Sequence, residues 1–358
     1  MLTTPLRAAD HRLPICDKLL KQTMKNLSQV IKQEFQNKTI VIVGDLVADQ
    51  FLHGTIARVS REAPVFILRH DETETLAGGA ANAAANVASL GGNAVLVGIV
   101  GRDVNGNALL EKLSTSNVNC AFLTASGKFA TTTKVRVLAG QHYAARQQVI
   151  RIDYENRAVL GADVLEILKT NLINASEKAD AIIISDYNYG VAHAEIARLA
   201  QKIAAERQIP LLVDSRFRLK EFTGATSATP NQEEVEQILG KDFTADGCGE
   251  LCRALGYEAL LVTRGNKGMI LAERDRQPVY LEAVGSKEPV DVTGAGDTVI
   301  AAYALGLASG LGFAESARLA NHAGGIVVMK KGTACVSAGE LIASLPKTQN
   351  TEQKAQSL

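Results

Sequence analysis

Five short apolar runs rich in β-branched residues recur along the chain and predict strands buried on both faces of a sheet. They span residues 39–43, 94–100, 181–184, 211–213 and 259–262. Stretches with helical spacing, such as 195–206 and 233–239, separate most of these runs. Strands that alternate with helices indicate an α/β fold, with a mostly parallel central sheet and helices on both of its faces.

Other segments break this alternation. Residues 132–138 and 147–152 are rich in β-forming residues and flank a loop. Together with a non-helical segment before residue 71, they predict a small antiparallel sheet inserted into the α/β body, a β lid of about residues 46–71 and 129–153. Such a lid could cover a substrate and exclude water, or serve only as an edge hairpin or dimer contact.

The two ends of the chain differ in pattern from this body. Apolar residues at helical spacing predict a helix over about residues 13–36. We therefore expect residues 1–37 to form an N-terminal helical extension and residues 38–346 to form the main domain. Residues 347–358 are polar and predict a frayed tail.

Polar side chains follow the predicted strands where each one ends. Four of the runs carry an aspartate within three residues of their end, namely Asp45, Asp103, Asp186 and Asp214. Ligands bind beyond the carboxyl ends of the strands in open α/β sheets, so we expect a functional site at this edge. A single aspartate of this kind could equally be a helix cap.

The stretch 290–298 carries the strongest chemical signal. Gly294 and Gly296 flank Ala295, and Asp297 follows at the start of a long apolar helix. The unpaired N–H groups and the helix dipole at such a start favour a bound anion. A carboxylate beside a bound phosphate suits the transfer of a phosphoryl group onto a hydroxyl. The alternative is a tight turn in which Asp297 only caps the helix.

A second glycine-rich segment places Gly78 and Gly79 before an alanine-rich helix. That helix carries Asn82 and Asn86 on one face. Glycine permits close approach of a ligand, and buried amides suit sugar hydroxyls because they both donate and accept. Tight helix packing explains the small residues equally well.

Three further motifs each allow two interpretations. Asn231 and Glu234 span a helix start, where they could hold a hydrated Mg²⁺ or form a capping box. The segment 263–268 offers cations and glycines to nucleotide phosphates, or forms a plain hairpin turn. Asn321 could pack near an adenine, whereas His322 has no evident partner and is interpreted as structural or surface-lying.

Composition excludes several classes of protein. Lys+Arg and Asp+Glu are both 38, so nothing argues for nucleic acid or a membrane surface. No apolar run reaches the roughly 18 residues of a membrane span, and the polar N-terminus lacks a signal peptide, so we expect a cytoplasmic protein. The 5 scattered cysteines predict neither disulfides nor a zinc site. The first strand is followed by Gly44-Asp45 rather than by the fingerprint of a dinucleotide-binding oxidoreductase.

Taken together, these motifs resemble those of the ribokinase-like, or PfkB, carbohydrate kinases over about residues 39–344. The most specific matches are residues 77–82, 229–231 and 291–298. Within that family the chain looks most like the kinases of D-glycero-D-manno-heptose 7-phosphate, the kinase half of bifunctional ADP-heptose synthesis proteins. The resemblance implies a three-layer ribokinase-like sandwich and an ATP- and Mg²⁺-dependent kinase acting on the anomeric hydroxyl. A kinase for another sugar or sugar phosphate, and a non-catalytic sugar or nucleotide sensor, are the alternatives.

The resemblance also implies roles for single residues. Asp297 is the expected base, and the N–H groups of Gly294, Ala295 and Gly296 would stabilise the transferred phosphoryl group. The residues expected to hold the substrate are Asp45, Gly78, Gly79, Asn82, Lys134, Arg136, Arg151 and Asp186. Those expected at ATP are Asn231, Glu234, Arg216, Thr263, Arg264, Gly265, Gly268 and Asn321, with Glu234 holding Mg²⁺ through water.

The lid cations bear on the choice of substrate. Lys134 and Arg136 lie two apart on one strand face, with Arg151 on the partner strand, and could bind a phosphate already on the sugar or be ordinary surface charge. The chain departs from the heptose-kinase pattern at Asp214-Ser215-Arg216, at Tyr189 in place of a lysine, and in a long loop over 139–146. The expected partners are a second copy bound through the lid, a monovalent cation such as K⁺, and a separate nucleotidyltransferase, because no His-x-Gly-His signature appears.

Overall fold

The computed structural model describes residues 27–346 except 141–145, 156–159 and 287. Its large sheet consists of β1 (Thr39–Gly44), β4 (Asn93–Gly101), β5 (Asn119–Ser126), β8 (Ala181–Asp186), β9 (Leu211–Ser215), β10 (Ser227–Ala228), β11 (Ala259–Thr263), β12 (Met269–Glu273) and β13 (Val279–Leu281). The spatial order is β13-β12-β11-β10-β9-β8-β1-β4-β5. All neighbours pair in parallel except β11–β12 and β12–β13 at one edge. The five predicted strands are thus confirmed as β1, β4, β8, β9 and β11.

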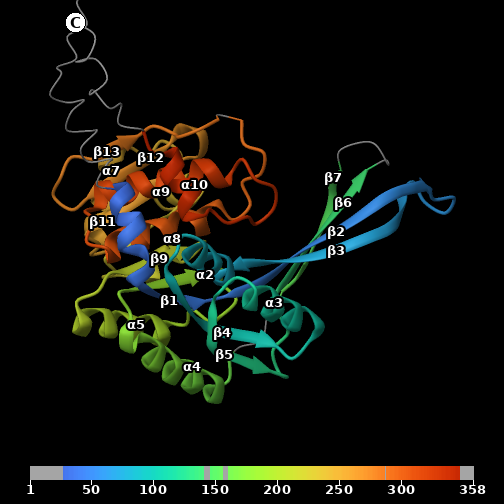
Figure 1. Ribbon diagram of the computed structural model, residues 1–358, viewed down its shortest axis with the longest axis horizontal. Coiled ribbons are helices and arrows are strands. Elements are labelled where there is room, and N and C mark those ends of the chain that lie inside the picture. The colour runs from blue at the N-terminus through green and yellow to red at the C-terminus, as the bar shows by residue number, and fades with distance from the viewer. Residues whose placement is uncertain (1–26, 141–145, 156–159, 287, 347–358) are drawn as a thin grey trace, which may run out of the picture.

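Helices cover both faces of this sheet (Figure 1). One layer contains α2 (Ala80–Ser89), α3 (Val104–Ser114), α8 (Ala295–Ala308), α9 (Phe313–Val327) and α10 (Ala338–Ser344). The other contains α4 (Ala162–Ala175), α5 (Ala194–Arg207), α6 (Gln232–Leu239) and α7 (Ala245–Ala254). The predicted three-layer sandwich is therefore confirmed. None of the helices in the described residues is both long and apolar enough to span a bilayer.

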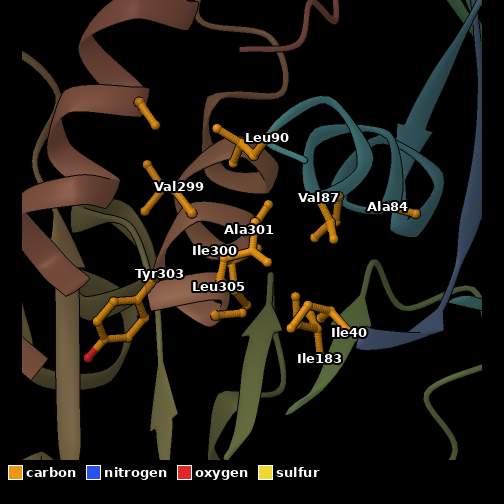
Figure 2. Close-up of a cluster of buried hydrophobic side chains, with 14 of the residues drawn as sticks. Ile40, Ala84, Val87, Leu90, Ile183, Val299, Ile300, Ala301, Tyr303 and Leu305 are labelled. Atoms are coloured by element: carbon orange, nitrogen blue, oxygen red, sulfur yellow. The ribbon is translucent and has the colours of Figure 1, made fainter. Parts of the chain in front are cut away.

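The central strands are apolar at every position because each of their faces packs against helices. On β1, Ile40 and Ile42 belong to one hydrophobic core, whereas Val41 and Val43 belong to the other. Figure 2 shows the first core, in which residues of α8 lie against α2 and the strands. Every residue of α8 from Asp297 to Gly306 is buried. This central helix begins beside the carboxyl ends of the strands and so fixes the position of its first turn.

The β lid is a separate sheet of β2 (Leu46–Val59), β3 (Phe66–Gly79), β6 (Thr133–Gly140) and β7 (Gln147–Tyr154), in the order β3-β2-β6-β7. Its central pair, β2 and β6, is parallel, so the prediction of an antiparallel lid is wrong for that pair. Both strands leave the large sheet at its carboxyl edge, β2 after β1 and β6 after β5, and therefore run outward together. β3 also returns as far as Gly79, beyond the predicted boundary at residue 71.

The described part of the predicted N-terminal extension packs into the main core. Residues 27–33 are helical and are followed by η1 (Phe35–Asn37). Leu27 and Phe35 are fully buried, and Ile31 nearly so, in the same hydrophobic core as the buried residues of α8 and α2. Residues 1–26, the tail 347–358 and the middle of the predicted long loop over 139–146 lie outside the described residues.

Substituting Phe35→Ala tests this role of the N-terminal segment. The change should lower the free energy of unfolding by about 3–5 kcal/mol, because it leaves a cavity in the core. The neighbouring Gln36 is exposed, so Gln36→Ala should change stability by no more than about 0.5 kcal/mol. Urea denaturation followed by circular dichroism measures both. Equal stabilities of the two variants would contradict the packing of Phe35 in the core.

Candidate functional site

Three of the four strand-end aspartates lie along one edge of the sheet. Asp45 follows β1, Asp186 ends β8 and Asp214 lies in β9, and these strands are neighbours. Asp103 departs from the prediction of a shared site, because its carboxylate caps α3. It accepts hydrogen bonds from the N–H of Gly106 at 2.7 Å and of Thr131 at 2.8 Å. The helix-cap interpretation thus holds for this one aspartate.

The first turn of α8 lies beside this edge. Gly294, its N-cap, has a φ of 75°, and a Cβ there would lie 2.4 Å from Nδ2 of Asn82, so only glycine fits. Its lack of a side chain leaves the first-turn N–H groups without a side-chain cap. The N–H of Ala295 donates to the carbonyl of Val292 at 3.2 Å. The N–H groups of Gly296 and Asp297 are therefore better placed than that of Ala295 to receive an anion.

Asp297, on this first turn, has both carboxylate oxygens hydrogen-bonded. Nδ2 of Asn82 donates to Oδ2 at 2.8 Å, and the hydroxyl of Tyr187 donates to Oδ1 at 3.0 Å. Burial, and next the nearby charge of Asp214, raise the pKa of Asp297 to about 8, while the two hydrogen bonds act in the opposite direction. A carboxylate with so high a pKa can accept a proton near neutral pH, as a general base must.

The amides predicted on one face of the second glycine-rich helix orient this base. Asn86 donates through Nδ2 to Oδ1 of Asn82 at 3.1 Å and accepts from the hydroxyl of Thr298 at 2.9 Å. Both asparagines are fully buried. The pair links α2 to α8 and fixes which group of Asn82 meets Asp297. The predicted contact of Asn82 with a sugar stays a prediction.

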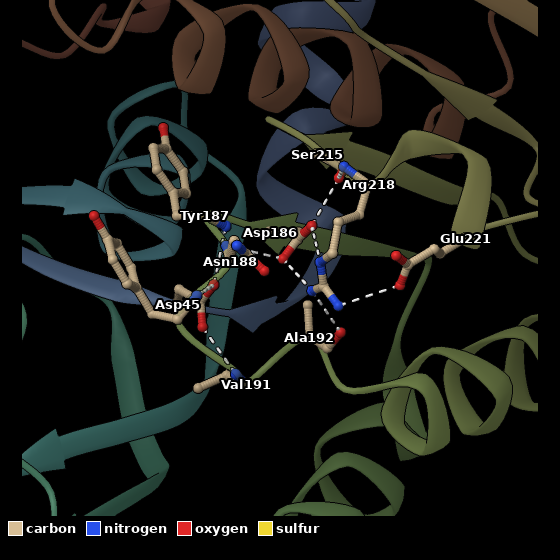
Figure 3. Close-up of polar contacts among 10 residues, drawn as sticks. Asp45, Asp186, Tyr187, Asn188, Val191, Ala192, Ser215, Arg218 and Glu221 are labelled. Carbon is tan, nitrogen blue, oxygen red and sulfur yellow. Dashed lines mark hydrogen bonds and ion pairs between the residues drawn. The ribbon is translucent and has the colours of Figure 1, made fainter. Parts of the chain in front are cut away.

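Asp45 organises the loop that follows β8 (Figure 3). Its carboxylate accepts the backbone N–H groups of Tyr187, Tyr189 and Val191, each at 2.9 Å. Burial raises the pKa of Asp45, and the hydrogen bonds from the loop offset this in part. The side chain is 1% exposed. In this structure Asp45 positions a loop, and its predicted contact with the sugar is untested.

Asp186, also predicted at the substrate, lies in a second buried network (Figure 3). It accepts from the guanidinium of Arg218 at 2.5 and 3.2 Å and from the hydroxyl of Ser215 at 2.7 Å. Its side chain is fully buried, so this ion pair compensates a charge that would otherwise destabilise the fold. Sequence reasoning missed Arg218, which lies 32 residues away and has no local signal.

Asp49 on β2 is a further site residue that sequence reasoning missed. Its carboxylate pairs with Arg136 at 2.6 Å and lies against Gly78, where a Cβ would come within 2.6 Å of Oδ2. Burial raises the pKa of Asp49. The charge and the hydrogen bond of Arg136 act in the opposite direction and offset part of this rise. The available sequence signal is an acid directly after the apolar residues 46–48, and the structure places Lys134 of β6 opposite it.

The cations of the lid, Lys134, Arg136 and Arg151, share one face of its sheet, and their contact with a sugar phosphate stays a prediction. Lys134 is 8% exposed, with its ammonium 5.6 Å from the ring centre of Tyr187 and 5.9 Å from that of Tyr189. Burial, and next the charge of Arg216, lower the pKa of Lys134. Arg151 lies opposite Arg136 in the sheet register and forms a two-point contact with Asp153, at 2.9 and 3.0 Å.

A cavity of about 170 Å³ adjoins the other side of the α8 turn. Its lining includes the predicted nucleotide residues Thr263, Gly265, Gly268 and Asn321, together with Ala295 and Gly296. Arg264 is not part of this lining and lies instead near Cys248 on α7, where burial raises the pKa of the thiol to about 11 and the charge of Arg264 offsets this only in part. His322 is buried and shares a hydrogen bond with Ser344 at 3.1 Å, which agrees with a structural role.

Asn231 and Glu234 form the capping box at the start of α6. The carboxylate of Glu234 accepts from the backbone N–H of Asn231 at 2.8 Å and from its Nδ2 at 2.7 Å. Burial, and next the charge of Asp214, raise the pKa of Glu234 to about 8. Burial and Asp186 likewise raise the pKa of Asp214 to about 7, which the exposed Arg216 offsets in part.

The mutual repulsion of Asp214 and Glu234 favours a cation beside them. Within the described residues no group of three His, Cys, Asp or Glu side chains could enclose a metal ion. Two carboxyl groups close enough to interact suit Mg²⁺, because this ion keeps several waters and is held largely by substrate phosphates. Asp214 and Glu234 are the groups that fit its hydration shell.

Comparisons with known proteins agree with this geometry. Among solved structures, Escherichia coli phosphofructokinase-2 with potassium matches with a TM-score of 0.70 and 20% identity over 86% of this chain and 99% of that one. Arabidopsis thaliana ribokinase with ribose and ATP matches with a TM-score of 0.66 and 21% identity over 87% and 99%. At this identity the two matches establish the fold.

Curated relatives are closer in sequence. The bifunctional protein HldE of Caulobacter vibrioides is 39% identical over 89% of this chain and 66% of its own length. That of Haemophilus influenzae is 39% identical over 86% and 63%. This chain thus spans about two thirds of the length of these relatives. A profile described as "pfkB family carbohydrate kinase" matches residues 37–338. The chain therefore belongs to the pfkB family of carbohydrate kinases.

Proposed function

We propose that this kinase transfers the γ-phosphoryl group of ATP to the anomeric hydroxyl of D-glycero-D-manno-heptose 7-phosphate, a step toward ADP-heptose and lipopolysaccharide. The observation that carries the proposal is the buried Asp297 between Asn82 and Tyr187, with Lys134 directly above the Tyr187 ring. Tyr187 contacts both groups, so a proposed base for the sugar hydroxyl and a cation for a phosphate already on the sugar lie in one site. The similarity to HldE proteins supports the same substrate.

The proposed step needs little covalent chemistry from the protein. The sugar oxygen attacks the γ-phosphorus, its proton passes to Asp297, and the bond from that phosphorus to the β–γ bridging oxygen breaks to release ADP. The N–H groups at the start of α8 face the negative charge on the transferred group. Mg²⁺ held near Asp214 and Glu234 would neutralise phosphate charge. Arg216, Thr263 and Asn321 are the side chains proposed to contact ATP.

Turnover of candidate substrates by the wild-type chain and Asp297→Asn tests the assignment. We expect ADP release with heptose 7-phosphate, and a kcat lower by about 10²–10⁴-fold in the variant, because its amide cannot accept the proton. ATP binding, measured by calorimetry, should be retained. Since the pKa of Asp297 is raised to about 8, activity should be present above that pH and fall as the pH drops through it. A near-normal kcat in the variant would overturn the base.

Lys134→Met tests the binding of the sugar's phosphate. Removing the ammonium while keeping most of the unbranched side chain should raise KM for the sugar phosphate about 10-fold or more, since a charge-assisted hydrogen bond is lost. KM for the unphosphorylated sugar should hardly change. Arg69→Ala removes an exposed cation from the outer half of β3 and serves as the control. Equal effects on both substrates would exclude a phosphate contact at Lys134.

We also propose that a second copy covers the outer face of the lid. Ile150, Ile152 and Tyr154 share the face opposite the cations and are 54%, 42% and 58% exposed. One matching solved structure is the tetrameric inhibited form of Escherichia coli phosphofructokinase-2, and self-association of a protein with this fold supports the proposal. A monovalent cation near the α8 turn stays a prediction, supported by the potassium complex of that protein.

Ile150→Asp should reduce the mass in solution from that of a dimer to that of a monomer, because a charge would be buried in the interface. Ile167→Asp changes a residue of α4 that is 46% exposed and should leave the mass unaltered. Sedimentation at several protein concentrations measures both. A monomeric wild-type chain at all concentrations would exclude the proposed interface.

A further inference from the structure

The hydroxyl of Tyr187 donates to Oδ1 of Asp297 at 3.0 Å, although the two residues are 110 positions apart in the sequence. The opposite oxygen, Oδ2, is occupied by Asn82. Two donors on two oxygens fix the rotation of the carboxyl group about its bond to Cβ. Of the two donors, only Tyr187 comes from outside the helices that form the site.

The protein holds the Tyr187 side chain in place from several directions. Its backbone N–H donates to Asp45, which also accepts from Tyr189 and Val191 of the same loop. The ring lies against Gly79, where an added Cβ would approach its Cδ2 to 3.4 Å. The ammonium of Lys134 lies 5.6 Å from the ring centre. A backbone hydrogen bond, a glycine and a lysine thus together hold the phenol against Asp297.

We propose that Tyr187 is a positioning residue for the base, which aims the Asp297 carboxylate at the sugar hydroxyl and stabilises its ionised form. The inference rests on the proposed role of Asp297. A hydrogen bond from a neutral hydroxyl to a carboxylate favours the charged state. Loss of that bond should therefore make Asp297 harder to ionise.

Other groups also act on this carboxyl, and each comes from a different element. Asp214 on β9 and Asp49 on β2 both raise the pKa of Asp297, and the thiol of Cys335 before α10 lies close enough to be affected by it. Arg216 acts on Asp214 and on Tyr187. Burial and the charge of Asp297 keep the pKa of Tyr187 well above its usual range, so the phenol remains a donor throughout. A shift caused by Tyr187→Phe would thus report the hydrogen bond.

The test is a titration of Asp297 in Tyr187→Phe, which keeps the ring and removes only the hydroxyl. Carbon-13 NMR of protein labelled at the aspartate carboxyl follows ionisation without any substrate, and the signal lost in Asp297→Asn assigns the resonance. We expect the midpoint to move upward by about one pH unit, the order expected for a hydrogen bond to a charged group. Tyr189→Phe is the matched control, because the hydroxyl of Tyr189 contacts Glu155, directly after β7, at 3.3 Å rather than Asp297. Its midpoint should not move.

Kinetics give a second readout. In Tyr187→Phe the acid limb of the kcat profile should move upward with the carboxyl midpoint, lowering kcat about tenfold on the acid side while KM for ATP changes less than about twofold. An unchanged midpoint and acid limb would overturn the role of Tyr187 even if Asp297→Asn is inactive. An active Asp297→Asn would instead overturn the proposed base, whatever the titration of Tyr187→Phe shows. The two failures are therefore distinguishable.

Discussion

The site depends on a carboxylate that the fold buries without a direct cation. Asp297 is 2% exposed, and its partners are an amide and a phenol rather than a lysine or arginine. Ionising it costs free energy, and the nearby Asp214 adds to that cost. Since its pKa is raised, the folded protein loses stability as the pH rises through that value. The ionised carboxylate that a base requires is therefore the form of Asp297 that stabilises the fold less.

Two nearby aspartates, Asp45 and Asp186, are also buried, but each has strong donors around its carboxylate. Asp45 accepts three backbone N–H groups and Asp186 pairs with the guanidinium of Arg218, and these contacts offset part of the cost of burying each carboxylate. The loop that follows Asp186 is held by Asp45 and places the hydroxyl of Tyr187 against Asp297. Asp45 and Asp186 at this edge are therefore held by hydrogen bonds and an ion pair, whereas the partners of Asp297 on α8 are an amide and a phenol.

Much of this arrangement could be predicted from the sequence, because local patterns encode it. The strands buried on both faces are recognisable as short apolar runs, and Asn231 and Glu234 are three residues apart, so a capping box is one of the two interpretations that their spacing allows. The contacts of Asp45 and Asp186 depend on groups distant in the sequence, which no local pattern reveals. The parallel pairing of β2 and β6 likewise depends on where each strand leaves the large sheet. The position of Asp49 depends on the strand register of the lid, which places it beside Lys134 and Arg136 and which no local sequence pattern reveals.

The continuity of β1 and β2 has a mechanical consequence. Only Asp45 separates the strand that ends in the central sheet from the one that forms the middle of the lid. The residue that holds the Tyr187 loop is therefore also the joint of the lid. A change in the direction of β2 at this residue would act directly on the carboxylate that accepts the N–H groups of the loop. A ligand that contacts the lid would therefore reach the loop that carries Tyr187 through a single residue.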